Sequence, residues 1–290
     1  MIKDFKYFAP KTLKEALTLL DKYQDECKVI AGGQSLLVLM KQGLVAPEYL
    51  IDIKGLTELN YIKSDAKGLR IGALTTHRAI EKSAVIKRKC SVLAEMEQRL
   101  ASIQTRNWGT IGGNICHGEP AGDPAPVLIA LNATLSLASV KGKRNMAVED
   151  FSLDYFETAL EHNELLTEIQ VPAAPPHTGT AYTKFNVIES DLATVGVAVS
   201  ITLRSGDGVC QDVRIALGAS APTPMRAKQA EAVVKGKKIT DNLLKEAGEI
   251  ASTEAEPISD IYASAEYRRE LMKVLVSRVG KEALARAKQA

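Results

Sequence analysis

The spacing of hydrophobic residues predicts that helices and strands alternate at the start of the chain. Apolar residues recur at helical spacing behind the capping-box pair Thr12 and Glu15, so we expect a helix over residues 13–23. An apolar run at 28–31 then ends at two glycines, after which a helical pattern resumes and a strand follows at 49–52. This strand, glycine turn, helix and strand predict a small parallel sheet.

A longer set of elements is predicted before the cluster of prolines at 172–177. After Asp123, a proline and an apolar run are typical of a helix with its N-cap. The expected elements are a hairpin over 61–72, two helices over 78–100, a helix over 124–131, a second hairpin from strands at 134–140 and 144–148, and a strand at 165–171.

The pattern changes after the proline cluster, which is the best candidate for a domain linker. Apolar residues alternate with small or polar ones at 195–203 and 213–217, on either side of a turn at 206–208, and indicate a half-buried antiparallel sheet. From about residue 225 the spacing becomes helical. We therefore expect an α+β protein whose C-terminal sheet carries helices on one face.

Composition limits the possible partners. The 290 residues are 46% hydrophobic and 25% charged, which suits a packed interior, and the net charge of +2 provides no strong field for nucleic acid or an anionic membrane. No apolar run approaches the roughly 18 residues that span a bilayer, and the N-terminus lacks a signal peptide's apolar core, so we expect a cytoplasmic protein. The four cysteines lack CxxC or CxxH spacing, so we expect no zinc or iron–sulfur centre within this chain.

Two glycine-rich stretches are the best candidates for chemistry. In the first, Gly32 and Gly33 follow a strand and precede a helix, where missing side chains allow backbone N–H groups to approach a phosphate, and Ser35 adds a hydroxyl. Alone, such a short motif more often marks a simple turn.

The second stretch, residues 106–114, holds three glycines, a threonine hydroxyl and the amide of Asn114, and predicts a loop that cradles a pyrophosphate. It matches neither the Rossmann nor the P-loop motif. At Gly112 we expect an aspartate to meet the phosphate and repel it. Two such stretches suggest a bisphosphate held from two sides.

Several single residues have a structural and a functional interpretation. Asp123 can cap a helix or accept hydrogen bonds from ribityl or ribose hydroxyls. Lys184 is either a solvated strand residue or a cation near a reduced flavin. His77 and His117 have no spaced partner, and Trp108 is more typical of packing than of stacking.

Six motifs in chain order resemble the FAD-binding medium subunit of the molybdenum hydroxylases, the group that includes carbon monoxide dehydrogenase, quinoline oxidoreductase and xanthine dehydrogenase. They lie at 5–10, 31–36, 71–77, 106–114, 121–123 and 259–271. The resemblance implies two subdomains of a vanillyl-alcohol-oxidase (PCMH)-type FAD-binding domain at 1–56 and 57–176. A C-terminal domain with a three-stranded antiparallel sheet and helices would follow at 177–290.

The resemblance also implies a non-covalent FAD site. Its pyrophosphate would lie on 31–35 and 110–114, with Asp123 at the ribityl or ribose and Lys184 near the ring. The full set of implied FAD-binding residues is Val29, Ile30, Ala31, Gly32, Gly33, Gln34, Ser35, Leu36, Thr110, Ile111, Gly112, Gly113, Asn114, Asp123, Leu166 and Lys184. Gln34 stands where other members carry histidine, threonine or aspartate, so the flavin's surroundings and its electron acceptor stay open.

The implied function is that of an electron outlet. A small partner subunit with [2Fe-2S] clusters would pass electrons to the FAD and on to NAD, a quinone or oxygen, while a large subunit would hold the molybdenum cofactor. The assembly would be a dimer of heterotrimers. The alternatives are a self-contained flavin oxidase of the vanillyl-alcohol-oxidase type and a nucleotide-binding module without redox chemistry.

Overall fold

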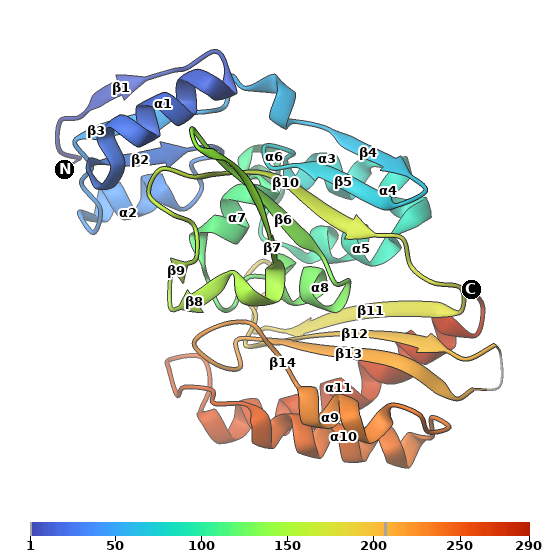
Figure 1. The fold of residues 1–290 in the computed structure, drawn as a ribbon. Coiled ribbons are helices and arrows are strands. Elements are labelled where there is room, and N and C mark those ends of the chain that lie inside the picture. The colour runs from blue at the N-terminus through green and yellow to red at the C-terminus, as the bar shows by residue number, and fades with distance from the viewer. Residues whose placement is uncertain (1, 206–207) are drawn as a thin grey trace.

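A computed structural model describes residues 2–205 and 208–290 of the chain. Figure 1 shows three main sheets, which follow one another from the N-terminal lobe at the top to the C-terminal lobe at the bottom. No strand crosses the expected limits at residues 56 and 176, although the domain limits themselves stay predictions. The mixture of helices and antiparallel and parallel strands confirms the α+β class.

The N-terminal sheet is parallel, as the sequence predicts. Its strands are β1 (Lys6–Phe8), β2 (Cys27–Ile30) and β3 (Tyr49–Asp52), in the order β1-β3-β2. Helix α1 (Leu13–Tyr23) begins where the hydroxyl of Thr12 accepts a hydrogen bond from the Glu15 N–H, and α2 (Leu36–Gln42) follows the first glycine stretch. Strand β1 had no predicted counterpart.

The central sheet has five strands in the order β4-β5-β10-β6-β7, all paired antiparallel. Both predicted hairpins are present within it. Its strands are β4 (Ile62–Asp65), β5 (Gly68–Gly72), β6 (Thr134–Ser139), β7 (Gly142–Ala147) and β10 (Leu165–Pro172). A short unpredicted pair, β8 (Ser152–Asp154) and β9 (Glu157–Thr158), and three 3-10 turns, η1 (Gln24–Glu26), η2 (Thr57–Leu59) and η3 (Val148–Asp150), complete the connections.

Two predictions in this region, one of helices and one of a loop, are wrong. The segment expected to form two helices forms three, α3 (His77–Lys82), α4 (Ala84–Lys89) and α5 (Ser91–Arg99), because Ser83 ends one helix and its hydroxyl caps the next. The second glycine stretch is not a loop. It lies in α6 (Ile103–Trp108) and α7 (Ile111–His117), and the predicted α8 (Pro124–Ala130) follows.

The C-terminal sheet has the order β11-β12-β13-β14, so the expected three-stranded sheet carries a fourth strand of two residues. Helices α9, α10 and α11 cover one face, as predicted (Figure 1). The elements are β11 (Thr178–Phe185), β12 (Val195–Leu203), β13 (Cys210–Gly218), β14 (Met225–Arg226), α9 (Lys228–Val234), α10 (Asp241–Glu254) and α11 (Ala265–Ala287). The turn predicted at 206–208 lies partly outside the described residues.

Helix α8 joins the two larger lobes. Its side chains Val127, Leu128 and Ile129 are buried in the same core as the central sheet. A Cβ on Gly218 of β13 would lie 3.2 Å from Pro126, so the C-terminal sheet packs closely on the same helix. The helix is thereby held against β13, and Asp123 just before it is bonded to Lys184 of the neighbouring β11.

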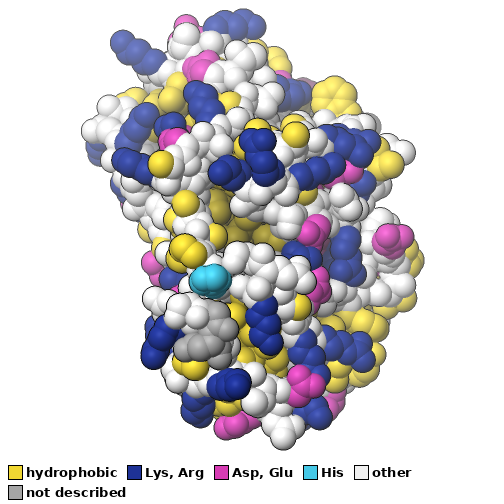
Figure 2. All heavy atoms as spheres, turned by 90° about the vertical axis from the view of Figure 1, so that its right-hand side faces the viewer, with side chains coloured by type: hydrophobic (Ala, Val, Ile, Leu, Met, Phe, Trp, Pro, Cys, Tyr) yellow, Lys and Arg dark blue, Asp and Glu magenta, His cyan; other side chains and the backbone are white. Residues whose placement is uncertain are grey.

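One face of the molecule carries charged side chains of both signs. Figure 2 shows basic side chains spread over both halves of one face, with acidic side chains between them and a hydrophobic recess across the middle. No helix in residues 2–205 or 208–290 is long and apolar enough to cross a lipid bilayer.

Candidate functional site

The two glycine stretches lie against each other. A Cβ on Gly32 would be 2.1 Å from the backbone oxygen of Trp108 and 2.8 Å from Cα of Gly109. Ala31 and Gly113 also face each other, because a Cβ on Gly113 would lie 3.9 Å from that of Ala31. Segments about 80 residues apart in the chain therefore form one surface, which we call the glycine junction (residues 31–35 and 108–114).

The first stretch leaves its hydrogen-bond donors free. Within the described residues, the backbone N–H groups of 32–35 donate no hydrogen bond, and the hydroxyl of Ser35 does not cap α2. Gly33 has φ +73°, a left-handed conformation that a side chain would strain. Free N–H groups in a half-exposed turn are the donors that an anion requires.

The second stretch has the N–H groups of residues 111–113 already paired. Ile111 donates to the Thr75 carbonyl at 3.0 Å, Gly112 to the Ala73 carbonyl at 3.0 Å, and Gly113 to the Thr110 hydroxyl at 3.1 Å. The stretch therefore supports the junction mainly by close backbone packing rather than by a row of open donors.

The expectation that a side chain at position 112 would face a phosphate is wrong, because such a side chain would point into the protein. A Cβ there would lie 2.6 Å from both the Cβ and the carbonyl oxygen of Ala73, on the buried side of α7. The exposed Gly113 and the half-buried Asn114, whose amide has no hydrogen-bond partner among the described residues, are the positions of this helix that a ligand can reach.

Asp123 and Lys184 form one buried cluster with Tyr182. The Lys184 Nζ donates to Asp123 Oδ2 at 2.7 Å and to the Asp191 carbonyl at 2.9 Å, and the Tyr182 hydroxyl donates to Asp123 Oδ1 at 2.6 Å. Burial raises the pKa of Asp123, and the Lys184 ammonium opposes that rise. The Asp123 side chain makes no helix cap, and Lys184 is 4% exposed rather than solvated.

Tyr182 and Asp191 were not predicted as site residues. Because side chains alternate along a strand, Tyr182 lies on the same face as Lys184, and the sequence could therefore have indicated Tyr182 as a site residue. Asp191 contributes a backbone oxygen, for which side-chain patterns give no indication.

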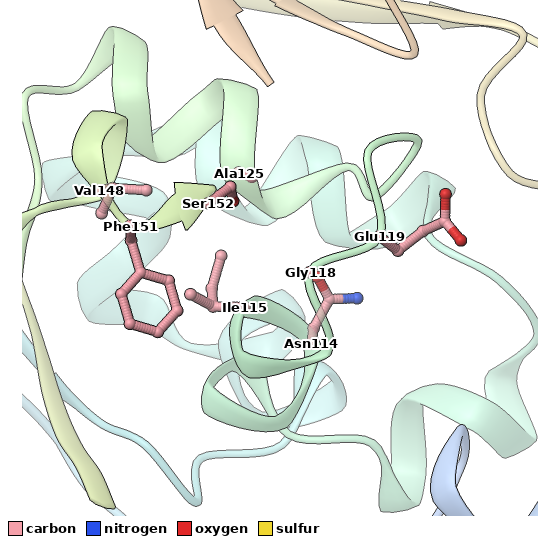
Figure 3. Close-up of a pocket in the computed structure, with 8 residues that line it drawn as sticks. All are labelled: Asn114, Ile115, Gly118, Glu119, Ala125, Val148, Phe151 and Ser152. Carbon is pink, nitrogen blue, oxygen red and sulfur yellow. The ribbon is translucent and has the colours of Figure 1, made fainter. Parts of the chain in front are cut away.

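A small cavity borders α7. Figure 3 shows Ile115, Val148 and Phe151 on one side of it, with Asn114 and Glu119 on the other. Its volume of about 10 Å³ suits at most one water molecule, so it cannot hold a cofactor.

A second cavity of about 460 Å³ lies between the central and C-terminal lobes. Residues 119–121 and Tyr155 line it from one lobe. From the other lobe it is lined by residues 190–194, Ala219, Ala221, Pro257, Ile258, Asp260, Tyr262 and Arg268. Because Asp191 both lines this cavity and accepts the Lys184 hydrogen bond, the cavity adjoins the Asp123 cluster. Its size is that of a small-molecule site.

The apolar residues expected at the site have different surroundings. Ile30 is buried with Met40 and Leu50, next to the partly buried Leu36, while Val29 packs at the edge of the α1 core. Leu166 is 3% exposed within the main core. Of the remaining candidates, Trp108 is 63% exposed at the glycine junction and the His117 ring lies 5.2 Å from that of Phe156.

Arg106 anchors the second stretch and was not predicted to do so. Its Nε donates to Glu81 Oε2 at 3.0 Å, and its Nη1 donates to the carbonyls of Leu100 and Ala101 at 2.7 and 2.8 Å. The Arg106 side chain is only 8% exposed, so these contacts fix the chain before α6.

Comparison with known proteins adds to this geometry. Residues 3–174 match the family described as "FAD binding domain in molybdopterin dehydrogenase", and residues 180–283 match "CO dehydrogenase flavoprotein C-terminal domain". The chain belongs to this family. Its members include the medium chain of glyceraldehyde dehydrogenase from Sulfolobus acidocaldarius, which is 37% identical over 96% of this chain and 98% of its own length.

The chain is also similar to carbon monoxide dehydrogenase, both in sequence and in structure. Its medium chain from Hydrogenophaga pseudoflava is 36% identical over 97% of this chain and 98% of the relative. A solved structure of the enzyme from that organism, lacking the Mo-pyranopterin moiety of the molybdenum cofactor, superposes with a TM-score of 0.95 at 37% identity, covering 99% of each chain. The expected family and fold are thus confirmed.

The residues at the glycine junction fit FAD. A pyrophosphate needs several N–H donors in one place, and four consecutive free groups at 32–35 with the Ser35 hydroxyl supply them. The cavity that borders the Asp123 cluster has room for a ring system.

Proposed function

We propose that this chain holds one FAD non-covalently and is the electron outlet of a molybdenum hydroxylase. The row of free N–H groups at 32–35, pressed against the second glycine stretch, is the observation that carries the proposal. Membership of a family of FAD-binding chains supports it.

Each part of the site has a proposed task. The N–H groups of 32–35, the Ser35 hydroxyl and the Asn114 amide would bind the pyrophosphate, while Gly113 would let it approach α7. Ala31, Gln34, Thr110, Ile111 and Gly112 shape this surface, and Val29, Ile30, Leu36 and Leu166 support it from the core.

The Asp123 cluster would define the other end of the cofactor. Lys184 uses two of its three N–H donors on Asp123 and Asp191, so one remains for an oxygen or nitrogen of the ring. A cation at this point stabilises negative charge that develops when a flavin is reduced. FAD supplies the capacity to accept and release electrons, and the chain positions it and adjusts its potential.

The rest of the enzyme would lie in partner subunits. We place the molybdenum cofactor in a large subunit and two [2Fe-2S] clusters in a small one, within a dimer of heterotrimers, because the named relatives are medium chains of dehydrogenases. NAD, a quinone or oxygen would be the final acceptor. The four free cysteines fit a cytoplasmic location.

Purification tests this proposal. The chain expressed alone should be yellow, and acid precipitation should release all the flavin as FAD into the supernatant. Expressed with its genomic neighbours, it should co-purify with molybdenum and iron. A colourless chain that fails to take up added FAD would contradict the proposal, and a lone chain that oxidises an organic substrate with oxygen would favour the self-contained oxidase.

A further inference from the structure

A buried histidine–carboxylate pair lies directly behind the glycine junction. The Nδ1 atom of His77 is 3.1 Å from Glu97 Oε1 and 2.9 Å from Oε2, and the two residues are 2% and 0% exposed. The pair is unlike the other contact between a histidine and a carboxylate, since the side chains of His162 and Asp25 are 70% and 73% exposed.

The imidazole connects Glu97 to the junction. With Nδ1 turned to Glu97, the opposite edge of the ring lies next to Gly109, because a Cβ there would be 3.1 Å from His77 Cδ2. The same point would be 3.6 Å from Cγ of Gln34 in the first stretch. The backbone N–H of His77 also donates to the Gly109 carbonyl at 3.0 Å, which fixes the ring at this place.

The charges around the pair compensate the negative charge of an ionised Glu97 only weakly. Burial raises the pKa of Glu97; the contact with His77 and the charge of Arg106 oppose the rise, and the carboxylate of Asp123 adds to it. Arg106 is itself engaged by Glu81, which Arg78 and Lys82 also contact. A wholly buried carboxylate with a single hydrogen-bonding partner is costly in its ionised form.

We infer that the His77–Glu97 pair takes up a proton from solvent when FAD binds, so that FAD affinity depends on pH. This inference rests on the proposed FAD site. A pyrophosphate at the junction places negative charge beside the imidazole edge and disfavours the pair's anionic form, in which His77 is neutral and Glu97 ionised. Adding one proton changes the pair from a charge of −1 to neutral and removes the repulsion.

Calorimetry of FAD binding to the flavin-free chain tests the inference. Titrations at pH 8 in Tris and in HEPES, which release different heats on ionisation, give the number of protons taken up. We expect a measurable uptake of up to one proton, with affinity falling by up to about tenfold per pH unit as the pH rises. His77→Gln should bind FAD with no uptake, and Glu97→Gln should show reduced uptake at pH 8.

The exposed pair provides the matched control, since His162→Gln should retain the full uptake of the parent chain. FAD binding without proton uptake, or full uptake by His77→Gln, would overturn the inference while leaving the proposed function intact. Failure of the parent chain to bind FAD would instead refute the proposed function.

A second measurement needs no variant and so does not depend on His77→Gln folding. The chain has four histidines, whose ring carbons can be resolved by NMR. FAD added at pH 8 should shift the His77 ring signals and leave those of His162 in place. Unchanged His77 signals on saturation with FAD would overturn the inference.

Discussion

The two glycine stretches have similar composition and opposite structural roles. Residues 32–35 form a half-exposed turn with free N–H groups, whereas the N–H groups of 111–113 are bonded to the protein and Ile111 and Gly112 are buried. In the first stretch the missing side chains open the backbone to a ligand. In the second they allow α7 to pack on Ala73. Substitutions in the first stretch should therefore affect FAD binding, and substitutions in the second should affect stability.

The largest effect is expected for Gly112→Asp. Its Cβ would lie 2.6 Å from the Ala73 carbonyl oxygen, and its charge would be buried, so the flavin-free chain should lose about 3 kcal/mol or more of unfolding free energy. Urea unfolding measures the loss. Gly55→Ala, whose nearest neighbour is 3.9 Å away, is the control and should unfold like the parent chain. A Gly112→Asp variant that is as stable as the parent chain but no longer binds FAD would instead support the interpretation that position 112 faces the phosphate.

Arg106→Met should remove the anchor of the second stretch and cost about 3 kcal/mol at pH 7, because the Leu100 and Ala101 carbonyls lose their donor and Glu81 loses a partner. The exposed Arg70→Met is the control and should change stability by less than about 1 kcal/mol.

The same variant has a pH signature. Burial raises the pKa of Glu81, but the Arg78 hydrogen bond and the Arg106 charge outweigh it and hold that pKa below its usual 4.5. A lowered folded-state pKa stabilises the fold above pH 4.5 and loses that effect as the pH falls through the folded value. The stability difference between parent and Arg106→Met should therefore narrow at acid pH. A constant difference would contradict this role for the ion pair.

Ser35→Ala should have the opposite effect and weaken FAD binding without lowering stability. The hydroxyl caps no helix in the structure, so the unfolding of the flavin-free variant should match that of the parent, while a lost hydrogen bond to a charged pyrophosphate weakens FAD binding by about tenfold. Fluorescence titration of FAD measures the affinity, with the exposed Ser91→Ala as control. Parent-like affinity would remove Ser35 from the site.

The smallest effect is expected for Asn114→Ala, which removes the free side-chain amide that α7 carries. Its loss should weaken FAD binding about fivefold, corresponding to a net hydrogen bond of about 1 kcal/mol. A loss far larger than that of Ser35→Ala would mean that α7 rather than the first stretch dominates binding.

Sequence patterns predicted those elements that local rules determine. The Thr12 cap gave helix α1, and the alternation at 195–203 gave β12. They failed for α7, since glycine disfavours helices and this one depends on the Thr110 cap and on burial of Ile111 and Ile115. Likewise the motifs identified the glycine stretches, but their contact and the bond between Asp123 and Lys184 join distant segments and arise only in the folded chain.

Amide hydrogen exchange with and without FAD tests the central claim most directly, because it reads both glycine stretches in one sample. In the flavin-free chain, the amides of 32–35 should exchange rapidly and those of 111–113 slowly. Saturating FAD should protect 32–35 strongly and leave 111–113 nearly unchanged. Rapid exchange at 32–35 in the presence of bound FAD would contradict the assignment of these N–H groups to the pyrophosphate.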